Sequence, residues 1–511
     1  MDFLNPNIAA RLVEAARRHP SRPALIESGR GRRRALTYED LAQRIAAFAA
    51  EFRGRGVRRG ERVLLLVPMS IELYVVLLAV LHAGGTAVFV DAWAGWRRVD
   101  EVARKTRPRL FVGSLRAHTL RLVSPALRAI PSAMLVDPRG RGRPRGPALA
   151  PEPLESSSPA LVTFTTGSTG SPKASLRTHA FLWEQHEVLS RHLGPSEGDV
   201  DMPTLPIFVL HNLASGVTSV LPDFDPRRPA EIDPARIRRQ LVCERVTSAT
   251  GSPAFFDRLL EAGKLPLRRV YTGGAPVLPA LARRLEAGTE GKAFVVYGST
   301  EAEPISLIEV GEMRVAMDET GEDGICVGTP VSEIRVRIVR PGSTEAVAQG
   351  GAGEIVVSGP QVQTAYFDDE TADLASKISD GSTVWHRTGD GGRVDEQGRL
   401  WLLGRVGSRV TARGRTWWSL PAELRALRLE GVGHAAYLGV EGRGAVLCLE
   451  GAGLGSRSEL LERARRQLDP YPVDEVRVLE RIPRDPRHAS KTDARALRER
   501  LGLAAPTSDP A

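Results

Sequence analysis

Short apolar segments alternate with longer helical segments through the first 150 residues. Residues 8–18 carry an apolar stripe at helical spacing, and residues 71–82 are helical in the same way. Residues 62–67 and 87–90 are short apolar runs, typical of buried strands. Thr37 precedes acidic residues, as an N-cap precedes the first turn of a helix. This alternation constrains the fold strongly, because strands separated by helices of this length form parallel α/β units.

The later part of the chain predicts a second lobe. Residues 160–400 repeat the α/β style, and within them residues 333–340 alternate with period two and predict a β-hairpin with residues 353–358. From about residue 405, short strands alternate with Arg-rich helices. We therefore expect an α/β protein with a large N-terminal lobe of stacked α/β subdomains (residues 1–404) and a small α+β lobe (residues 405–511).

The basic residues are numerous but dispersed. Lys and Arg number 70 against 61 Asp and Glu, which gives a net charge of +9. A nucleic-acid interface needs basic residues clustered with aromatic ones or a known module, so this distribution predicts no nucleic-acid partner. Few of the basic residues are lysines, which makes each lysine a candidate for a special role: Lys105, Lys173, Lys264, Lys292, Lys377 and Lys491.

Several features predict a cytoplasmic protein without a membrane span. The three cysteines lie far apart and match neither a disulfide framework nor a metal-ligand spacing. The first residues lack the basic and apolar regions of a secretory signal. The most apolar stretch, residues 69–90, contains Glu72 and His82, so it predicts a buried helix followed by a strand.

Residues 165–173 form the sharpest motif of the sequence. They read TTGSTGSPK and follow an apolar, strand-like run at residues 160–164. Glycines let backbone N–H groups turn inward, hydroxyls add donors and the lysine adds charge, so this loop can wrap a polyphosphate. The pattern is not a Walker A motif, which ends in Gly-Lys-Ser/Thr. The candidate phosphate-binding residues are Thr165, Thr166, Gly167, Ser168, Thr169, Gly170 and Lys173.

This loop and five later segments together resemble the acyl-adenylate-forming superfamily, which includes acyl-CoA synthetases, luciferases and adenylation domains of peptide synthetases. The later segments occur in the order of that family, at residues 273–276, 297–301, 388–390, 404–405 and at Lys491. The resemblance covers nearly the whole chain. It implies that ATP and Mg²⁺ bind between the large lobe and a small lobe that is mobile.

The resemblance also implies a set of nucleotide-binding residues. Glu301 is an acid within a phosphate site, which fits a role in holding a cation, and Mg²⁺ prefers oxygen ligands. Thr300, before it, would contact the α-phosphate. The other expected contacts are Gly274, Ala275 and Pro276 at the adenine, Tyr297 with Gly298 and Ser299 beside the adenine, Asp390 at the ribose, and Arg405 at the ribose and phosphates.

Two further residues are candidates for catalysis near the C-terminus. Lys491 stands where the family places its adenylation lysine, between the substrate carboxylate and the α-phosphate, where it would stabilise growing negative charge. His488 lies three residues earlier and titrates near neutral pH, so it could act as a base in a second step. A loop histidine bonded to the backbone is the other interpretation of His488.

Four positions depart from the common pattern of the superfamily. Val209 stands where a histidine is usual, Ala174 follows Lys173 in place of glycine, Gly407 falls in the hinge region, and Thr411 replaces a lysine. The segments at residues 297–306, 404–410 and 487–491 instead resemble the β-lactone synthetase branch of bacterial olefin biosynthesis. The replacement of the lysine at Thr411 makes coenzyme A chemistry doubtful.

The resemblance therefore implies a specific reaction. A carboxylic acid, expected to be a 3-hydroxy fatty acid, is adenylated, and its own hydroxyl then attacks the acyl carbonyl to give a β-lactone and AMP. Intramolecular attack of this kind gains from proximity. The alternative is a fatty acyl-CoA or acyl-AMP ligase that transfers the acyl group to the thiol of coenzyme A or of a carrier protein. Other enzymes of the pathway would be the protein partners.

Overall fold

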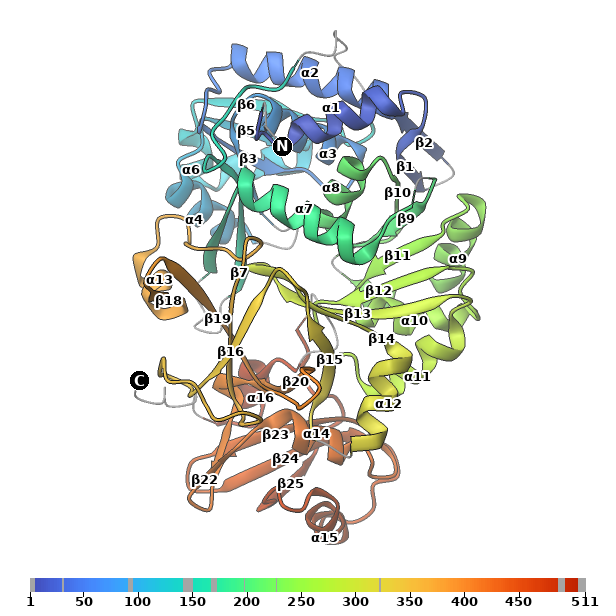
Figure 1. Cartoon of the computed structure of the whole chain (residues 1–511), viewed down its shortest axis with the longest axis vertical. Helices are drawn as coiled ribbons and strands as arrows, with labels where there is room; N and C mark the ends of the chain where they lie inside the picture. The colour runs from blue at the N-terminus through green and yellow to red at the C-terminus, as the bar shows by residue number, and fades with distance from the viewer. Residues whose placement is uncertain are drawn as a thin grey trace.

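The computed structural model describes most of the chain and arranges it as a tall, layered molecule. The N-terminal half lies at one end and the C-terminal lobe at the other (Figure 1). The described residues are 5–29, 32–90, 95–140, 150–166, 172–196, 198–226, 228–320, 323–485 and 492–503.

A six-stranded sheet organises the N-terminal part. Its order is β6-β5-β3-β4-β7-β8, and every pair is parallel except β7 with β8. The strands are β3 (Arg62–Leu66), β4 (Thr86–Phe89), β5 (Leu110–Gly113), β6 (Ser132–Leu135), β7 (Pro159–Thr166) and β8 (Pro172–Thr178). The helices around it are α1 (Ala9–Arg18), α2 (Tyr38–Gly54), α3 (Ile71–His82), α4 (Trp96–Thr106), α5 (Leu115–Thr119), α6 (Pro125–Ala129) and α7 (His179–Leu193).

A second sheet of 14 strands runs through the middle of the molecule. From β1 to β13 its neighbours β1-β10-β9-β11-β12-β13 are parallel, and from β13 onward they are antiparallel. The strands are β1 (Pro23–Gly29), β2 (Arg32–Thr37), β9 (Val200–Pro203), β10 (Thr218–Leu221), β11 (Ser248–Gly251), β12 (Arg269–Gly273), β13 (Lys292–Ser299), β14 (Ala302–Glu309), β15 (Ile325–Pro330), β16 (Arg335–Val339), β17 (Gly353–Ser358), β18 (Lys377–Asp380), β19 (Thr383–Val394) and β20 (Leu400–Arg405). Its helices are α8 (Pro206–Ser215), α9 (Pro234–Cys243), α10 (Pro253–Leu259), α11 (Pro279–Gly288), α12 (Val310–Thr320) and α13 (Glu370–Ser376).

The C-terminal segment has a sheet and a core of its own. The three strands β23-β24-β25 and the hairpin β21-β22 surround an apolar cluster that includes Leu447, Leu460 and Val476. The elements are β21 (Val410–Ala412), β22 (Arg415–Trp417), α14 (Ser419–Ala426), β23 (Val432–Val440), β24 (Gly444–Gly451), α15 (Arg457–Leu468), β25 (Glu475–Val478) and α16 (Ala494–Arg500). Figure 1 shows this lobe at the foot of the molecule.

The expected α/β class is confirmed. The helices predicted at residues 8–18 and 71–82 are α1 and α3, and Thr37 caps α2 by accepting a hydrogen bond from the backbone N–H of Asp40. The predicted hairpin is β16 paired antiparallel with β17. The strands β1 and β2 were not predicted. They leave the N-terminal part and join the large sheet, where Leu25 pairs with Ser219.

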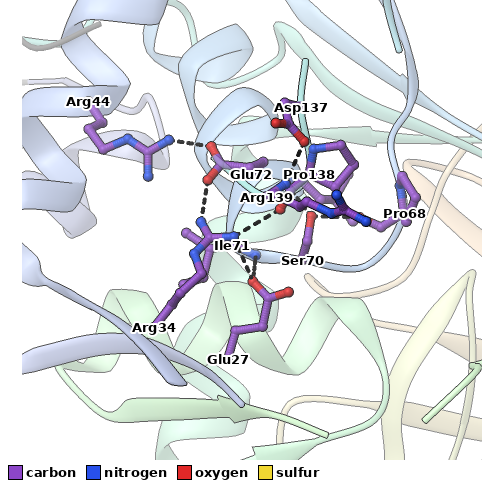
Figure 2. A network of polar contacts seen from close by, with 11 residues as sticks. Glu27, Arg34, Arg44, Pro68, Ser70, Ile71, Glu72, Asp137, Pro138 and Arg139 are labelled. Atoms are coloured by element: carbon purple, nitrogen blue, oxygen red, sulfur yellow. Dashed lines mark hydrogen bonds and ion pairs between the residues drawn. The ribbon is translucent and has the colours of Figure 1, made fainter. Parts of the chain in front are cut away.

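A buried group of charges holds this N-terminal hairpin against the other sheet. Glu72, in the first turn of α3, accepts hydrogen bonds from Arg44 of α2 and from Arg34 of β2 (Figure 2). Arg34 also lies 3.4 Å from Glu27 of β1, and donates to the carbonyl of Pro138 at 2.9 Å. Charged groups this deeply buried need such partners, because burial removes their hydration.

Candidate adenylation site

The carboxylate of Asp390 stands at the centre of the candidate nucleotide site. Tyr297, at the end of β13, donates its hydroxyl to Oδ2 of Asp390 at 2.9 Å. Arg405, which pairs with Asp390 across β19 and β20, donates to Oδ1 at 2.7 Å. The backbone N–H of Asp390 in turn donates to Thr388 Oγ1 at 3.0 Å. The structure thus brings together three residues that the sequence placed around adenine and ribose.

The surroundings of Tyr297 and Arg405 keep both side chains protonated. Burial, together with the nearby Asp390 carboxylate, raises the pKa of the Tyr297 phenol well above its ordinary value. Tyr297 therefore stays protonated and acts as a donor. The charge of Asp390 raises the pKa of Arg405, which keeps the guanidinium charged. Each carboxylate oxygen of Asp390 retains accepting capacity after these bonds, so it can also accept ribose hydroxyls.

Trp418 packs against Gly391, the residue that follows Asp390 on β19. A Cβ atom built on Gly391 would lie only 1.9 Å from the Trp418 ring, so glycine is required for the ring to approach. Trp418 immediately precedes α14 of the C-terminal lobe. The residue next to Asp390 is thus a contact between the large sheet and the beginning of the small lobe.

Glu301 lies in the turn between β13 and β14, beside two lysines. Its Oε1 accepts a hydrogen bond from the hydroxyl of Tyr366 at 3.0 Å. The ammonium groups of Lys173 and Lys377 lie 5.4 and 5.2 Å from the centroid of the Tyr366 ring. Lys173 also donates to Ser376 Oγ at 2.9 Å. One carboxylate close to two ammonium groups suits a site for a metal-bound polyphosphate.

Sequence reasoning assigned no role in the site to Lys377 or Tyr366. Lys377 begins β18 and donates to the carbonyl of Gln363, with His386 Nδ1 at 3.2 Å. Burial lowers the pKa of Lys377 to about 8, although the charge of Glu301 opposes the shift. A signal for Lys377 existed in the sequence, because it is one of the few lysines in an Arg-rich chain. Tyr366 carried no such signal.

The pKa of Lys377 predicts that ATP binding near pH 8 takes up protons. Anionic phosphates placed near the ammonium raise its pKa, so a half-protonated lysine gains up to about half a proton on binding. Isothermal titration calorimetry at pH 8, in two buffers of different ionisation enthalpy, measures this uptake. We expect Lys377→Met to lose it.

Lys292→Met is the matched control for this measurement. Lys292 is exposed and pairs with Glu309 at 2.6 Å, so its replacement should leave the uptake unchanged. Heats that are independent of the buffer in the unmodified protein would contradict the prediction. Uptake that persists in Lys377→Met would contradict it as well.

The remaining predicted residues are partly described. Thr165 and Thr166 end β7, where their backbones pair with Lys173 and Pro172 of β8. Gly274, Ala275 and Pro276 follow β12, and Gly274 has a φ of +80°, a conformation that favours glycine. Gly298 and Ser299 end β13, and the carbonyl of Thr300 accepts a hydrogen bond from buried Arg177 at 2.9 Å. Gly167, Ser168, Thr169, Gly170, His488 and Lys491 lie outside the described residues.

The positions that depart from the superfamily pattern have clear surroundings. Val209 is fully buried in the apolar core between α8 and the N-terminal helices. Thr411 is exposed on β21, and its hydroxyl lies 3.3 Å from that of Thr416. Gly407 lies in the short turn after β20. Position 411 therefore carries no positive charge, whereas the superfamily pattern has a lysine there.

A small apolar cavity, lined by no charged side chain, lies between α1, α3, α7 and α8. His186 and His211 share a hydrogen bond of 3.1 Å within it. Burial lowers the pKa of His186 to about 4 and holds the pKa of His211 well below its ordinary value, so both are neutral. Gln185 links the cavity to β14 by donating to the carbonyl of Glu303 at 3.3 Å. Its aliphatic walls include Ile8, Leu12, Leu78, Leu81, Leu182, Leu189, Ile207, Leu210 and Leu213.

Comparison with known families agrees with this geometry. A family described as AMP-binding enzyme matches residues 12–367, so the chain belongs to the AMP-binding enzyme family. The chain is accordingly an ATP-dependent acyl-adenylate-forming ligase. It is 36% identical over 506 residues to the olefin β-lactone synthetase of Stenotrophomonas maltophilia (strain K279a), covering 90% of each chain. It is also 32% identical over 552 residues to the olefin β-lactone synthetase of Xanthomonas campestris pv. campestris, covering 97% of each.

Solved structures show the same fold. The ATP-bound MatB of Rhodopseudomonas palustris matches with a TM-score of 0.84 at 22% identity, covering 98% of this chain and 99% of that one. The O-succinylbenzoate coenzyme A synthetase MenE of Bacillus subtilis, in complex with AMP, matches with a TM-score of 0.80 at 22% identity, covering 97% and 98%. In the part of the chain that the structure describes, no helix combines the length and apolar character needed to cross a bilayer.

Proposed function

We propose that this enzyme adenylates a 3-hydroxy fatty acid and then closes the acyl-adenylate to a β-lactone. The likeness to two olefin β-lactone synthetases over nearly the whole chain carries this proposal. The exposed threonine at position 411 supports a second step that needs no thiol acceptor.

The first step is attack of a substrate carboxylate oxygen on the α-phosphorus of ATP. A new P–O bond forms, and the bond to pyrophosphate breaks. Both reactants are anions, so the residues must first neutralise charge. Lys173 and Lys491 supply positive charge, and Thr300 contacts the α-phosphate. Glu301 would hold Mg²⁺, which, when bound, neutralises phosphate charge.

The second step uses the hydroxyl of the substrate itself. The 3-hydroxyl oxygen attacks the acyl carbon while its proton passes to a base, for which His488 is the candidate. The acyl C–O bond then breaks, AMP leaves and a four-membered lactone remains. The boundary between the proposed lobes lies at residues 404–405, in the last strand of the large sheet. Movement of the small lobe about Gly407 would separate the two steps.

Product analysis tests this function. The protein is incubated with ATP, Mg²⁺ and 3-hydroxydecanoic acid, and the products are followed by ¹H NMR and by AMP release. We expect a β-lactone and stoichiometric AMP without any thiol. Decanoic acid, which lacks the attacking hydroxyl, is the matched substrate and should give acyl-adenylate but no lactone.

Addition of coenzyme A or a carrier-protein thiol distinguishes the second candidate function. A thioester formed at the expense of lactone would assign the enzyme to acyl transfer instead. Pyrophosphate exchange without lactone or thioester from 3-hydroxy acids would overturn the β-lactone proposal while leaving adenylation intact.

A further inference from the structure

We propose that one outer surface of the N-terminal sheet docks on an anionic lipid membrane. The surface lies where β6 is the edge strand of the six-stranded sheet, and we call it the β6 edge surface. It consists of Leu115, Arg116, Leu122, Val123, Arg128 and Leu135. This inference is independent of the proposed lactone chemistry.

Exposed apolar side chains are concentrated at this surface. Leu115, Leu122, Val123 and Leu135 are between 53% and 76% exposed. Among the described residues, nine large apolar side chains are at least 42% exposed. Five of these nine, Trp96 and the four named above, lie within 40 residues of sequence. Single exposed leucines are common on protein surfaces, but a local group of them indicates an interaction site.

The topology gathers these residues although they are separated in sequence. Leu135 ends β6, and its register partner on β5 is Gly113, two residues before Leu115. His118 of α5 lies 3.0 Å from the carbonyl of Met134, which holds α5 against the end of β6. The short helix η1 (Leu120–Leu122) then leads to α6, so the whole β5–β6 connection lies around this edge. Figure 1 shows α4 and α6 on the outer side of the sheet.

The same segment is strongly basic. Residues 102–136 contain seven Lys or Arg and no Asp or Glu, in a chain whose total net charge is +9. Two of the seven are paired with acids, Arg104 with Asp100 at 2.6 Å and Lys105 with Asp369 at 2.7 Å. The other five have no acidic partner within 4 Å among the residues that the structure describes: Arg107, Arg109, Arg116, Arg121 and Arg128.

Charge and apolar groups adjoin at this surface. The guanidinium of Arg128 donates to the carbonyl of Leu122 at 2.8 Å, which places a positive charge beside the most exposed leucine of the group. Side chains of this kind bind membranes by inserting apolar groups at the headgroup boundary, while basic groups meet anionic lipids. Charge complementarity therefore favours an anionic lipid surface over an apolar protein partner. An enzyme of aliphatic acids would gain access to membrane-held substrate by this contact.

Vesicle co-sedimentation tests the proposal. The full chain is mixed with vesicles of phosphatidylglycerol and phosphatidylcholine, or of phosphatidylcholine alone. We expect binding to the anionic vesicles at low salt and release at about 1 M salt, where charges are screened within about 3 Å. The double substitution Leu122→Ser with Leu135→Ser should weaken binding at least about tenfold. Arg116→Glu should weaken it by about the same factor, and only at low salt.

The double substitution Val242→Ser with Val478→Ser is the matched control. It removes two exposed valines from elsewhere on the molecule and should leave vesicle binding unchanged. Circular dichroism and pyrophosphate exchange show whether each variant is folded. Failure of the unmodified protein to bind anionic vesicles overturns the proposal, as does undiminished binding of the Leu122/Leu135 variant. Self-association abolished by that variant, without vesicle binding, would assign the surface to a second copy of the chain.

Discussion

Replacing Glu301 by Gln is expected to lower the rate of ATP–pyrophosphate exchange by about 10²- to 10³-fold, which is the usual cost of removing one preorganised electrostatic group. Glu301 lies in the turn between β13 and β14, and Tyr366 donates to its Oε1 at 3.0 Å. Gln keeps the size and an accepting oxygen but loses the negative charge. A neutral amide is a weak ligand for Mg²⁺, so the variant should require more Mg²⁺ for half-maximal exchange.

Glu309→Gln is the matched control for this measurement. Glu309 ends β14, at the other end of the strand that follows Glu301, and its carboxylate pairs with the exposed Lys292. The control therefore removes a charge from the same strand without touching the site. We expect exchange rates and Mg²⁺ dependence to stay unchanged. An exchange rate of Glu301→Gln equal to that of the control, at any Mg²⁺ concentration, would contradict the metal-binding role.

The substitution Tyr366→Phe tests the hydrogen bond that Tyr366 donates to the Glu301 carboxylate. The variant keeps the aromatic ring beneath Lys173 and Lys377 but removes the hydrogen bond to Glu301. A net loss of one hydrogen bond to a charged group is worth about 1.5–3 kcal/mol. We expect a smaller effect than that of Glu301→Gln, again with a raised Mg²⁺ requirement. An effect on exchange without any change in Mg²⁺ requirement would contradict this role for Tyr366.

The site was predictable where its residues fall in short motifs that occur in the order of the superfamily. Tyr297, Asp390 and Arg405 are far apart in sequence, but each lies in a motif of the superfamily, and the structure joins them. Tyr366 could not be predicted, because its place depends on a long-range contact. Its backbone forms an isolated bridge with Ser175 of β8, and no local pattern encodes that pairing.

The fold likewise has parts that local sequence predicts and parts that depend on long-range contacts. The helices α1, α2 and α3 were predictable because periodicity and capping are local properties. The destination of β1 and β2 was not, since the choice between two sheets is decided by partners almost 200 residues away, such as Ser219 opposite Leu25. Glu72 of α3 shows the same difference between local and long-range information. Its position suggested only a helix too polar for a membrane, whereas its partners Arg34 and Arg44 come from other elements.

Replacing Glu72 by Gln is expected to destabilise the protein by about 3–5 kcal/mol, as removal of one partner from a buried charge group usually does. Glu72 is 1% exposed and accepts from Arg34 at 2.5 Å and from Arg44, which is itself fully buried (Figure 2). The amide would leave Arg44 without a counter-charge in an environment that excludes water. Urea denaturation followed by circular dichroism measures the shift in midpoint.

Glu286→Gln provides the control on the surface. Glu286 pairs with Arg314 at 2.8 Å, and both side chains are well exposed, so the expected cost is only about 0–1 kcal/mol. The double substitution Arg44→Met with Glu72→Leu separates charge burial from lost packing. Because apolar residues of similar size do not need counter-charges, it should be more stable than Glu72→Gln alone. If the double variant is the least stable of the three, the network contributes more than mutual neutralisation, and the attraction between Arg44 and Glu72 exceeds the cost of burying both.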